Sequence, residues 1–177
     1  MEKTEYLIFS DSHGNVDALR LAVSRQISPP AGVFFLGDGL RDLDGLNALD
    51  PQKTLFYRVW GNCDWMSVPN APTTGVTALE GHTVLFTHGH LFSVKSGYGA
   101  LLAEAARRGA DIVLSGHTHV PHLEIIPIGT ELGGVTLNRP MYLFNPGSIG
   151  YNTDGKGASF GTLLIKGETV LLSHGRI

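Results

Sequence analysis

The chain has 177 residues, of which 42% are hydrophobic and 16% charged, and this balance suits one compact domain over residues 1–177. Its formal net charge of -3, with only 13 lysines and arginines, argues against duplex nucleic acid or an anionic membrane as a partner. We expect a cytoplasmic protein, because no signal peptide opens the chain and the single Cys63 fits a reducing compartment. These properties leave a homo-oligomer open.

The first part of the chain predicts alternating strands and helices. Five short apolar runs rich in β-forming residues each end at a polar residue or a glycine, as buried strands do, at residues 6–9, 33–36, 55–59, 84–86 and 112–114. Apolar residues at helical spacing predict a helix over 16–26 with Asn15 as its cap, and a second over 98–108 that Gly109 ends. This order indicates parallel pairing of the strands that flank each helix.

The second part of the chain is β-rich. From Leu123 onward helical patterns disappear, and strands are predicted at 123–126, 141–144, 160–165 and 169–172. Residues 150–157 are expected to form a surface loop. The predicted fold class is α/β: a layered α-β-β-α sandwich, with two mixed sheets packed face to face and helices on the outside.

Polar residues of the metal-ligand type follow five of the predicted strands. The five fragments are Asp11-Ser12-His13, Gly37-Asp38, Gly61-Asn62-Cys63-Asp64, Thr87-His88-Gly89-His90 and Gly116-His117-Thr118-His119. Because ligands bind at the carboxyl ends of strands in open α/β sheets, these distant segments can converge on one site. Oxygen and imidazole donors suit Mn, Fe, Ni, Co or Zn better than calcium or a thiolate site.

Each fragment taken singly also has an ordinary explanation. Gly37-Asp38 is a common turn with a capping carboxylate, and His88 could be a core histidine whose hydrogen bonds are satisfied. Gly116-His117-Thr118-His119 is more specific, since packing does not readily explain two imidazoles on either side of one residue after a buried strand.

The order of the five fragments resembles the signature of the calcineurin-like metallophosphoesterase superfamily: Asp-x-His, Gly-Asp, Gly-Asn, His and Gly-His-x-His. The form Gly61-Asn62-Cys63-Asp64 and the later Asn145-Pro146-Gly147-Ser148 are similar to its small prokaryotic phosphodiesterase branch. The resemblance implies two metal ions bridged by Asp38. It assigns one ion to Asp11, His13, Asp38 and His119, and the other to Asp38, Asn62, His88 and His117.

The function implied by this resemblance is a dinuclear-metal-dependent phosphoesterase, with phosphodiesters preferred over phosphomonoesters. Asp38, Asn62 and His88 would act in catalysis by holding a metal-bridging hydroxide and positioning the phosphate for in-line attack. The expected cofactors are two divalent ions, manganese first, with nickel, iron, zinc and cobalt also compatible. The expected partner is a small phosphoester substrate.

Cys63 departs from the pattern, because many members of the superfamily carry a histidine directly after Gly-Asn that assists at the phosphate or leaving group. A small loop residue is the simpler interpretation of Cys63, since nothing in the sequence indicates a lowered thiol pKa. We therefore expect diesters with good leaving groups to be preferred.

Several residues near the five fragments keep two interpretations. Asp64 could orient a ligand histidine or cap a turn, Arg41 and His90 could touch substrate or be solvated, and Asn145 to Ser148 are expected to support the site. Trp60 and Trp65 could wall a base-binding pocket or only pack, and His122, like His90, could touch substrate or be a solvated loop residue. His82 and His174 are expected to have no role.

Two other functional classes are compatible with parts of the pattern. The family includes a retromer subunit in which the fold serves as a protein-interaction scaffold with an altered site, whereas this chain keeps every ligand position. A metal-dependent amide or imide hydrolase also uses His-x-His and Asp ligands, but on a longer barrel of eight strand-helix units, which the β-rich second half disfavours.

Overall fold

A computed structural model describes residues 4–46, 49, 52–64, 71–151 and 155–177. In chain order its elements are β1 (Thr4–Phe9), α1 (Val16–Ser24), β2 (Gly32–Phe35), η1 (Leu40–Gly45), β3 (Leu55–Arg58), β4 (Thr74–Leu79), β5 (His82–Thr87), η2 (His90–Phe92), α2 (Gly99–Arg107), β6 (Ile112–Ser115), β7 (His122–Ile126), β8 (Glu131–Leu132), β9 (Val135–Thr136), β10 (Met141–Asn145), β11 (Ser159–Lys166) and β12 (Thr169–Arg176). None of the described helices is long and apolar enough to cross a membrane.

The strands form two mixed five-stranded sheets and a small β8–β9 hairpin. The first sheet has the order β12-β11-β1-β2-β3 and the second the order β4-β5-β6-β10-β7. The strands β1, β2 and β3 pair in parallel, and so do β5, β6 and β10. The parallel pairing predicted around each helix is therefore confirmed. It brings the carboxyl ends of three strands to one edge of each sheet.

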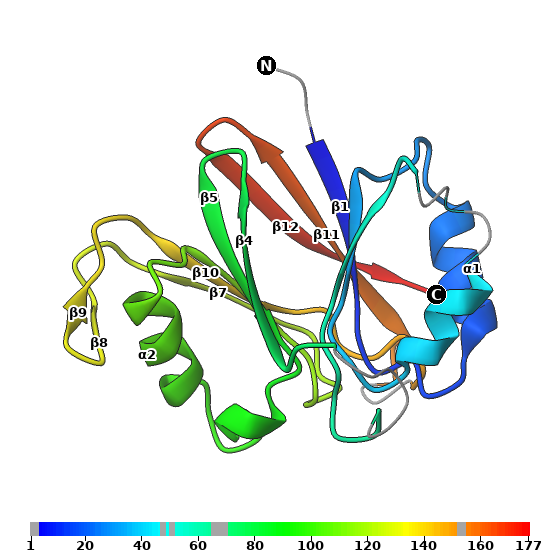
Figure 1. Cartoon of the computed structure of the whole chain (residues 1–177), viewed down its shortest axis with the longest axis horizontal. Coiled ribbons are helices and arrows are strands. Elements are labelled where there is room, and N and C mark those ends of the chain that lie inside the picture. Colours follow the sequence, from blue (N-terminus) through cyan, green and yellow to red (C-terminus); the bar gives the residue numbers. More distant parts are fainter. Residues whose placement is uncertain (1–3, 47–48, 50–51, 65–70, 152–154) are drawn as a thin grey trace.

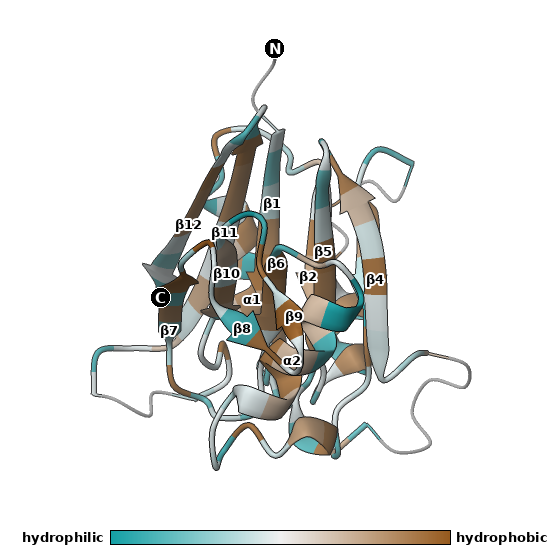
Figure 2. Cartoon of the chain, turned by 90° about the vertical axis from the view of Figure 1, so that its left-hand side faces the viewer, coloured by the Kyte–Doolittle hydropathy of each residue, from teal (hydrophilic) through white to brown (hydrophobic). Residues whose placement is uncertain are grey.

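The sheets pack face to face, with α1 on the outer side of the first and α2 on the outer side of the second (Figure 1). Phe34 and Phe144 belong to the buried cluster between the sheets. Leu19 belongs to the cluster beneath α1, and Leu101 to the cluster beneath α2. Figure 2 shows hydrophobic residues along β6, β10 and β11 in the interior. The predicted α-β-β-α sandwich is confirmed.

The helix boundaries follow the predicted signals closely. The Asn15 side chain accepts a hydrogen bond of 3.1 Å from the Ala18 N–H, as an N-cap residue does. Gly109 follows α2 with a φ of +68°, in the left-handed conformation that ends many helices. The helix predicted to Gln26 ends earlier, at Ser24, because the Gln26 N–H bonds to the Val23 carbonyl at 3.1 Å in a tighter turn.

The strand β4, the hairpin β8–β9 and the two 3₁₀ helices were not predicted from the sequence. The strand β4 lies at a sheet edge, is mostly half-exposed, and contains Gly75, so it carries no apolar run. Glycine is required there because a Cβ at Gly75 would meet the ring of Phe86. The last strand extends to Arg176, beyond the predicted end at residue 172.

Candidate metal centre

The predicted ligand residues lie in loops that follow the parallel strands of both sheets. Asp11 follows β1, Asp38 follows β2, His88 comes directly after β5, and His117 follows β6. Because these strands run in parallel within their sheets, their carboxyl ends deliver the side chains to a common place. The structure brings the predicted carboxylates and histidines together from segments up to 108 residues apart, Asp11 and His119 being the outermost.

The first group of donors consists of Asp11, His13 and His119. Asp11 Oδ1 lies 3.1 Å from His119 Nε2 and 3.8 Å from His13 Nε2. The two histidine nitrogens lie 3.4 Å apart. One atom from each residue lies within 4.8 Å of the others, so a single cation can contact all three.

The second group consists of Asp38, His88 and His117. His88 Nε2 lies 3.4 Å from Asp38 Oδ2 and 3.1 Å from His117 Nδ1. The same Asp38 oxygen lies 3.9 Å from His13 Nε2 of the first group. Asp38 therefore faces both groups.

The backbone in these loops is held in an unusual conformation. Seven non-glycine residues of the described chain have a positive φ, and five of them are predicted ligands: Asp11 (56°), His13 (46°), Asp38 (58°), His117 (68°) and His119 (61°). Such a backbone costs free energy, on the order of 1–3 kcal/mol per residue, and persists where the surrounding structure enforces it. The concentration of left-handed residues marks these loops as a functional site.

The donor set fits divalent cations. Asp11 Oδ1 is buried and has no hydrogen-bond partner in the described structure, and a cation would satisfy it. His88 Nδ1 donates a 2.7 Å hydrogen bond to the Leu36 carbonyl, which points Nε2 into the site. In each group two imidazole nitrogens face each other, and a cation between them would bind both lone pairs.

The electrostatics of the second group also suit a cation. Burial would raise the pKa of Asp38, but its hydrogen bond and attraction to His88 hold that pKa well below its usual range. The same pairing raises the pKa of His88 against the effect of burial. A bound cation would displace the proton that this pairing favours on His88, because histidines bind metals in the neutral form. Burial and the charge of His88 lower the pKa of His117 to about 4, so His117 is neutral at pH 7.

Asp64, for which the sequence left two roles possible, organises two of the loops. It is buried and accepts hydrogen bonds from four backbone N–H groups, at 2.6 to 2.9 Å; these belong to Asp38, Gly39, Leu40 and Gly61. Of the two roles expected for Asp64, orienting a ligand histidine is therefore wrong, because all four of these donors are backbone amides. Gly61 allows the close approach, because a Cβ there would meet the Asp38 carboxylate.

The segment from Asn145 to Ser148 supports the site from below, as expected. Asn145 Nδ2 donates to the Gly116 carbonyl at 2.9 Å and to Thr118 Oγ1 at 3.1 Å, which holds the loop of His117. Ser148 Oγ donates to the Asp11 carbonyl at 2.8 Å.

Asn62 and Cys63 lie at the exposed side of the site. The Asn62 amide donates a 3.3 Å hydrogen bond to Cys63 Sγ, and its place among the ligands stays a prediction. Cys63 Sγ lies within 4.8 Å of donor atoms of His13 and Asp38. Partial burial and the Asp38 carboxylate raise the pKa of the Cys63 thiol to about 11, so no lowered thiol pKa accompanies this position.

The remaining residues singled out in the sequence have mixed positions. The ring of His90 lies 5.3 Å from that of His88, its Nδ1 is buried without a partner in the described structure, and burial lowers its pKa. Arg41 is exposed on η1, and Trp60 packs against the cluster beneath α1. Trp65 lies outside the described residues. His122 stacks on Tyr98 with ring centroids 5.2 Å apart.

Two histidines expected to have no role are structural. His174 Nε2 donates to the Asn145 carbonyl at 2.8 Å, and its ring stacks on Phe144. His82 is buried and pairs with Asp111 at 2.7 Å. The sequence did not indicate these contacts, because each partner lies 29 residues away.

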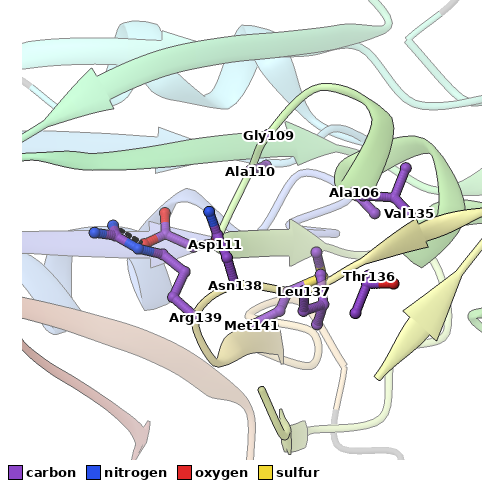
Figure 3. Close-up of a pocket in the computed structure, with 10 residues that line it drawn as sticks. All are labelled: Ala106, Gly109, Ala110, Asp111, Val135, Thr136, Leu137, Asn138, Arg139 and Met141. Atoms are coloured by element: carbon purple, nitrogen blue, oxygen red, sulfur yellow. Dashed lines mark hydrogen bonds and ion pairs between the residues drawn. The ribbon is translucent and has the colours of Figure 1, made fainter. Parts of the chain in front are cut away.

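A separate pocket lies at the amino end of β6, next to Asp111, whereas the predicted ligand His117 follows the carboxyl end of that strand. Its volume is about 170 Å³, and Arg139 donates a 2.8 Å hydrogen bond to Asp111 at its wall (Figure 3). Its lining is mostly apolar and consists of Ala106, Gly109, Ala110, Asp111, Val135, Thr136, Leu137, Asn138, Arg139 and Met141. The pocket is distinct from the predicted metal centre.

The two-sheet fold and the convergent carboxylates and imidazoles define a metal-binding α/β protein with its site at the strand ends. The model of the calcineurin-like phosphoesterase superfamily domain matches residues 5–175, and the chain belongs to this family of metal-dependent phosphoester hydrolases.

Individual relatives agree with the family. A probable metallophosphoesterase, YsnB of Bacillus subtilis, is 27% identical over 143 residues, which cover 81% of this chain and 73% of the relative. The crystal structure of a predicted phosphoesterase from Streptococcus pneumoniae has a TM-score of 0.72 and 26% identity, and the match covers 98% of this chain and 90% of that one. Vps29 of Entamoeba histolytica, complexed with zinc, has the same fold, with a TM-score of 0.66 and 21% identity over 97% of this chain and 98% of its own.

Proposed function

We propose that this chain is a dinuclear-metal-dependent phosphodiesterase for small phosphoester substrates. The observation that carries the proposal is the position of the Asp38 carboxylate between two groups of imidazoles, 3.4 Å from His88 and 3.9 Å from His13. A carboxylate facing two donor groups is the arrangement that lets one residue bridge two ions. The family match over residues 5–175 supports the further proposal that residues 1–177 form one domain.

The proposed ligands divide between two ions. One ion would be held by Asp11, His13, Asp38 and His119, and the other by Asp38, Asn62, His88 and His117. The donor groups around Asp11 and Asp38 support this division for all of these residues except Asn62. Manganese is our first choice, because the site combines carboxylate oxygens with imidazole nitrogens and needs no thiolate.

When bound, two divalent ions activate water and neutralise charge that develops on the phosphoryl oxygens. With two divalent ions bound, the site would stay cationic, because Asp11 and Asp38 supply the only carboxylates among the proposed ligands. The hydrogen bond from His88 to the Leu36 carbonyl fixes the orientation of that imidazole. The amides that bind Asp64 fix the loop of Asp38 in the same way. Once it held both ions, this preorganised site would attract an anionic phosphate.

The preference for diesters rests on Cys63. A leaving group that is poorly stabilised needs a positioned acid, and a thiol with a pKa of about 11 is a weak one. An aryl diester expels a phenoxide, which is a good leaving group and does not need such an acid. We therefore expect faster turnover of aryl diesters than of alkyl monoesters.

The test is hydrolysis by metal-stripped protein after addition of Mn, Ni, Zn or Mg. We expect activity on p-nitrophenyl diesters with added metal, lower activity on alkyl monoesters, and none when Asp38 is replaced by Asn. Equal activity with and without metal would contradict the proposal. So would a clear preference for alkyl monoesters.

The second candidate is the protein-interaction scaffold, and it finds support in the shared fold of Vps29, with a TM-score of 0.66. The same assay separates the two. A scaffold would bind metal without turnover, whereas the proposed enzyme turns over diesters in proportion to the bound ions.

A further inference from the structure

Tyr151 lies beside the first donor group although it is not one of the proposed ligands. Its ring stacks on His119 with centroids 5.7 Å apart and an interplanar angle of 17°. The same ring lies 5.0 Å from the ring of His13, tilted by 45°. Tyr151 is nevertheless 51% exposed. The ring therefore packs on two imidazoles of the site and keeps half of its surface open to solvent.

The backbone of Tyr151 is fixed to the strand end that carries Asp11. The Tyr151 N–H donates a 2.9 Å hydrogen bond to Ser148 Oγ, and that hydroxyl donates to the Asp11 carbonyl at 2.8 Å. The neighbouring Gly150 N–H also donates to the Asp11 carbonyl, at 3.1 Å. The same loop therefore fixes the backbone of both Tyr151 and Asp11.

We propose that Tyr151 forms an aromatic wall of the substrate site and selects phosphodiesters whose non-leaving group is a planar aromatic ring. The inference rests on the proposed function. A phosphoester held beside His13 and His119 can place one substituent against the ring that packs on them. An aromatic substituent can stack on the open surface of the tyrosine, whereas a methyl group gains little from it.

A purely structural tyrosine would behave differently. If the ring only oriented His13 and His119, its removal would weaken metal binding and slow all substrates alike. If it recognises substrate, its removal affects aromatic diesters and leaves methyl diesters unchanged. The comparison of two substrates with one leaving group therefore separates the two roles.

The experiment uses full-length, metal-loaded protein with p-nitrophenyl phenyl phosphate, thymidine 5′-(p-nitrophenyl phosphate) and p-nitrophenyl methyl phosphate. We expect Tyr151→Leu to lower kcat/KM about tenfold for the two aromatic diesters, mainly through KM, because stacking on one aromatic side chain has about this effect. The methyl diester should change less than about twofold. Tyr151→Phe keeps the ring and is the matched control, which should retain the aromatic preference.

A binding measurement provides a readout that does not depend on turnover. Calorimetric titration of metal-loaded protein with phenylphosphonate and methylphosphonate should show tighter binding of the phenyl compound in the wild type and in Tyr151→Phe, but not in Tyr151→Leu. Equal losses for all ligands, or no loss for any, would overturn the inference. If the wild type hydrolysed no diester, the proposed function would fail, and the ratio of phosphonate affinities would still decide the role of Tyr151.

Discussion

Two histidines at opposite ends of β5 show how this protein separates stability from function. Both are buried: His82 begins the strand and His88 follows it. His82 has acceptors at both ring nitrogens, Asp111 Oδ2 at 2.7 Å and the Gly167 carbonyl at 3.2 Å. His88 Nδ1 donates to the Leu36 carbonyl, whereas its Nε2 faces the Asp38 carboxylate and the imidazole of His117. A structural histidine is satisfied within the protein, whereas the site histidine keeps one nitrogen directed at a group of donors.

The backbone of the two ends differs in the same sense. His82 lies in a regular strand, and Asp111 also accepts hydrogen bonds from the Thr83 N–H at 2.7 Å and from Arg139 at 2.8 Å. At the other end the loops hold their ligand residues at positive φ. Hydrogen bonds at the amino ends of the strands stabilise the fold. Strained loops at the carboxyl ends hold donors where a cation can bind.

The largest effect is expected at the shared carboxylate. Asp38→Asn should abolish the binding of the two metal ions together. It should also lower kcat/KM by far more than the roughly 10–100-fold typical of residues that only support a ligand. The reason is that Asp38 faces both donor groups. Metal analysis and diester hydrolysis measure the result, with the fully exposed Asp17→Asn as control. Two tightly held ions in Asp38→Asn would contradict the role of Asp38 as the carboxylate shared by both donor groups.

The next effect is expected at the other end, in stability. Asp111→Ala should lower the free energy of unfolding by about 3 kcal/mol, because it leaves a buried donor of His82 and a half-buried donor of Thr83 without this acceptor. Its ion content should remain that of the wild type. Urea denaturation measures the loss. The exposed Glu168→Ala, whose carboxylate lies 3.9 Å from Arg139, serves as control and should change stability by less than about 0.5 kcal/mol. Loss of metal from Asp111→Ala would show that the two ends are not separate.

A smaller effect should distinguish the two donor groups from each other. His117→Ala should weaken the binding of one ion by more than the roughly 10–100-fold typical of residues that only support a ligand and leave the other ion bound, and His119→Ala should do the reverse. The reason is that His117 contacts His88, whereas His119 contacts Asp11 and His13. Titration with manganese measures both affinities, and His122→Ala is the control outside the groups. The same loss of a single site in both variants would mean that our division of ligands is wrong.

The sequence predicted those features that depend on local pattern. Buried strands carry apolar runs, and Asn15 and Gly109 mark helix ends by their own conformational preferences, so these elements were placed within a few residues. The strand β4 was missed because it has a glycine, Gly75, where a strand pattern would have an apolar side chain. The ring of Phe86 occupies the space that such a side chain would need. The donor types were visible from the order of the five fragments, because each follows a strand.

Contacts across the fold could not be predicted. Asp64 accepts backbone amides from a loop 24 to 26 residues earlier, and nothing in its neighbourhood in sequence indicates that loop. Tyr151 packs on His13 and His119, which are supplied by other strands. The contacts of His82 were not predicted, because its partner Asp111 directly precedes another strand. Such roles arise from the approach of distant segments, which single-sequence patterns do not encode.

The smallest loss is expected on removal of the Cys63 thiol, which lies beside the site but differs from the proposed ligands in exposure and chemistry. Its thiol has a pKa of about 11 and is exposed, so it is a poor proton donor and a poor thiolate ligand at pH 7. Cys63→Ala should therefore change kcat/KM for an aryl diester by less than about threefold and keep both ions. Cys63→His should raise activity on alkyl diesters, because an imidazolium can protonate a poorer leaving group. A well-placed acid typically raises the rate by about 10²-fold or more. Loss of an ion from Cys63→Ala would instead assign the thiol to the group it forms with His13 and Asp38, and the sulfur would then count as a ligand rather than a bystander.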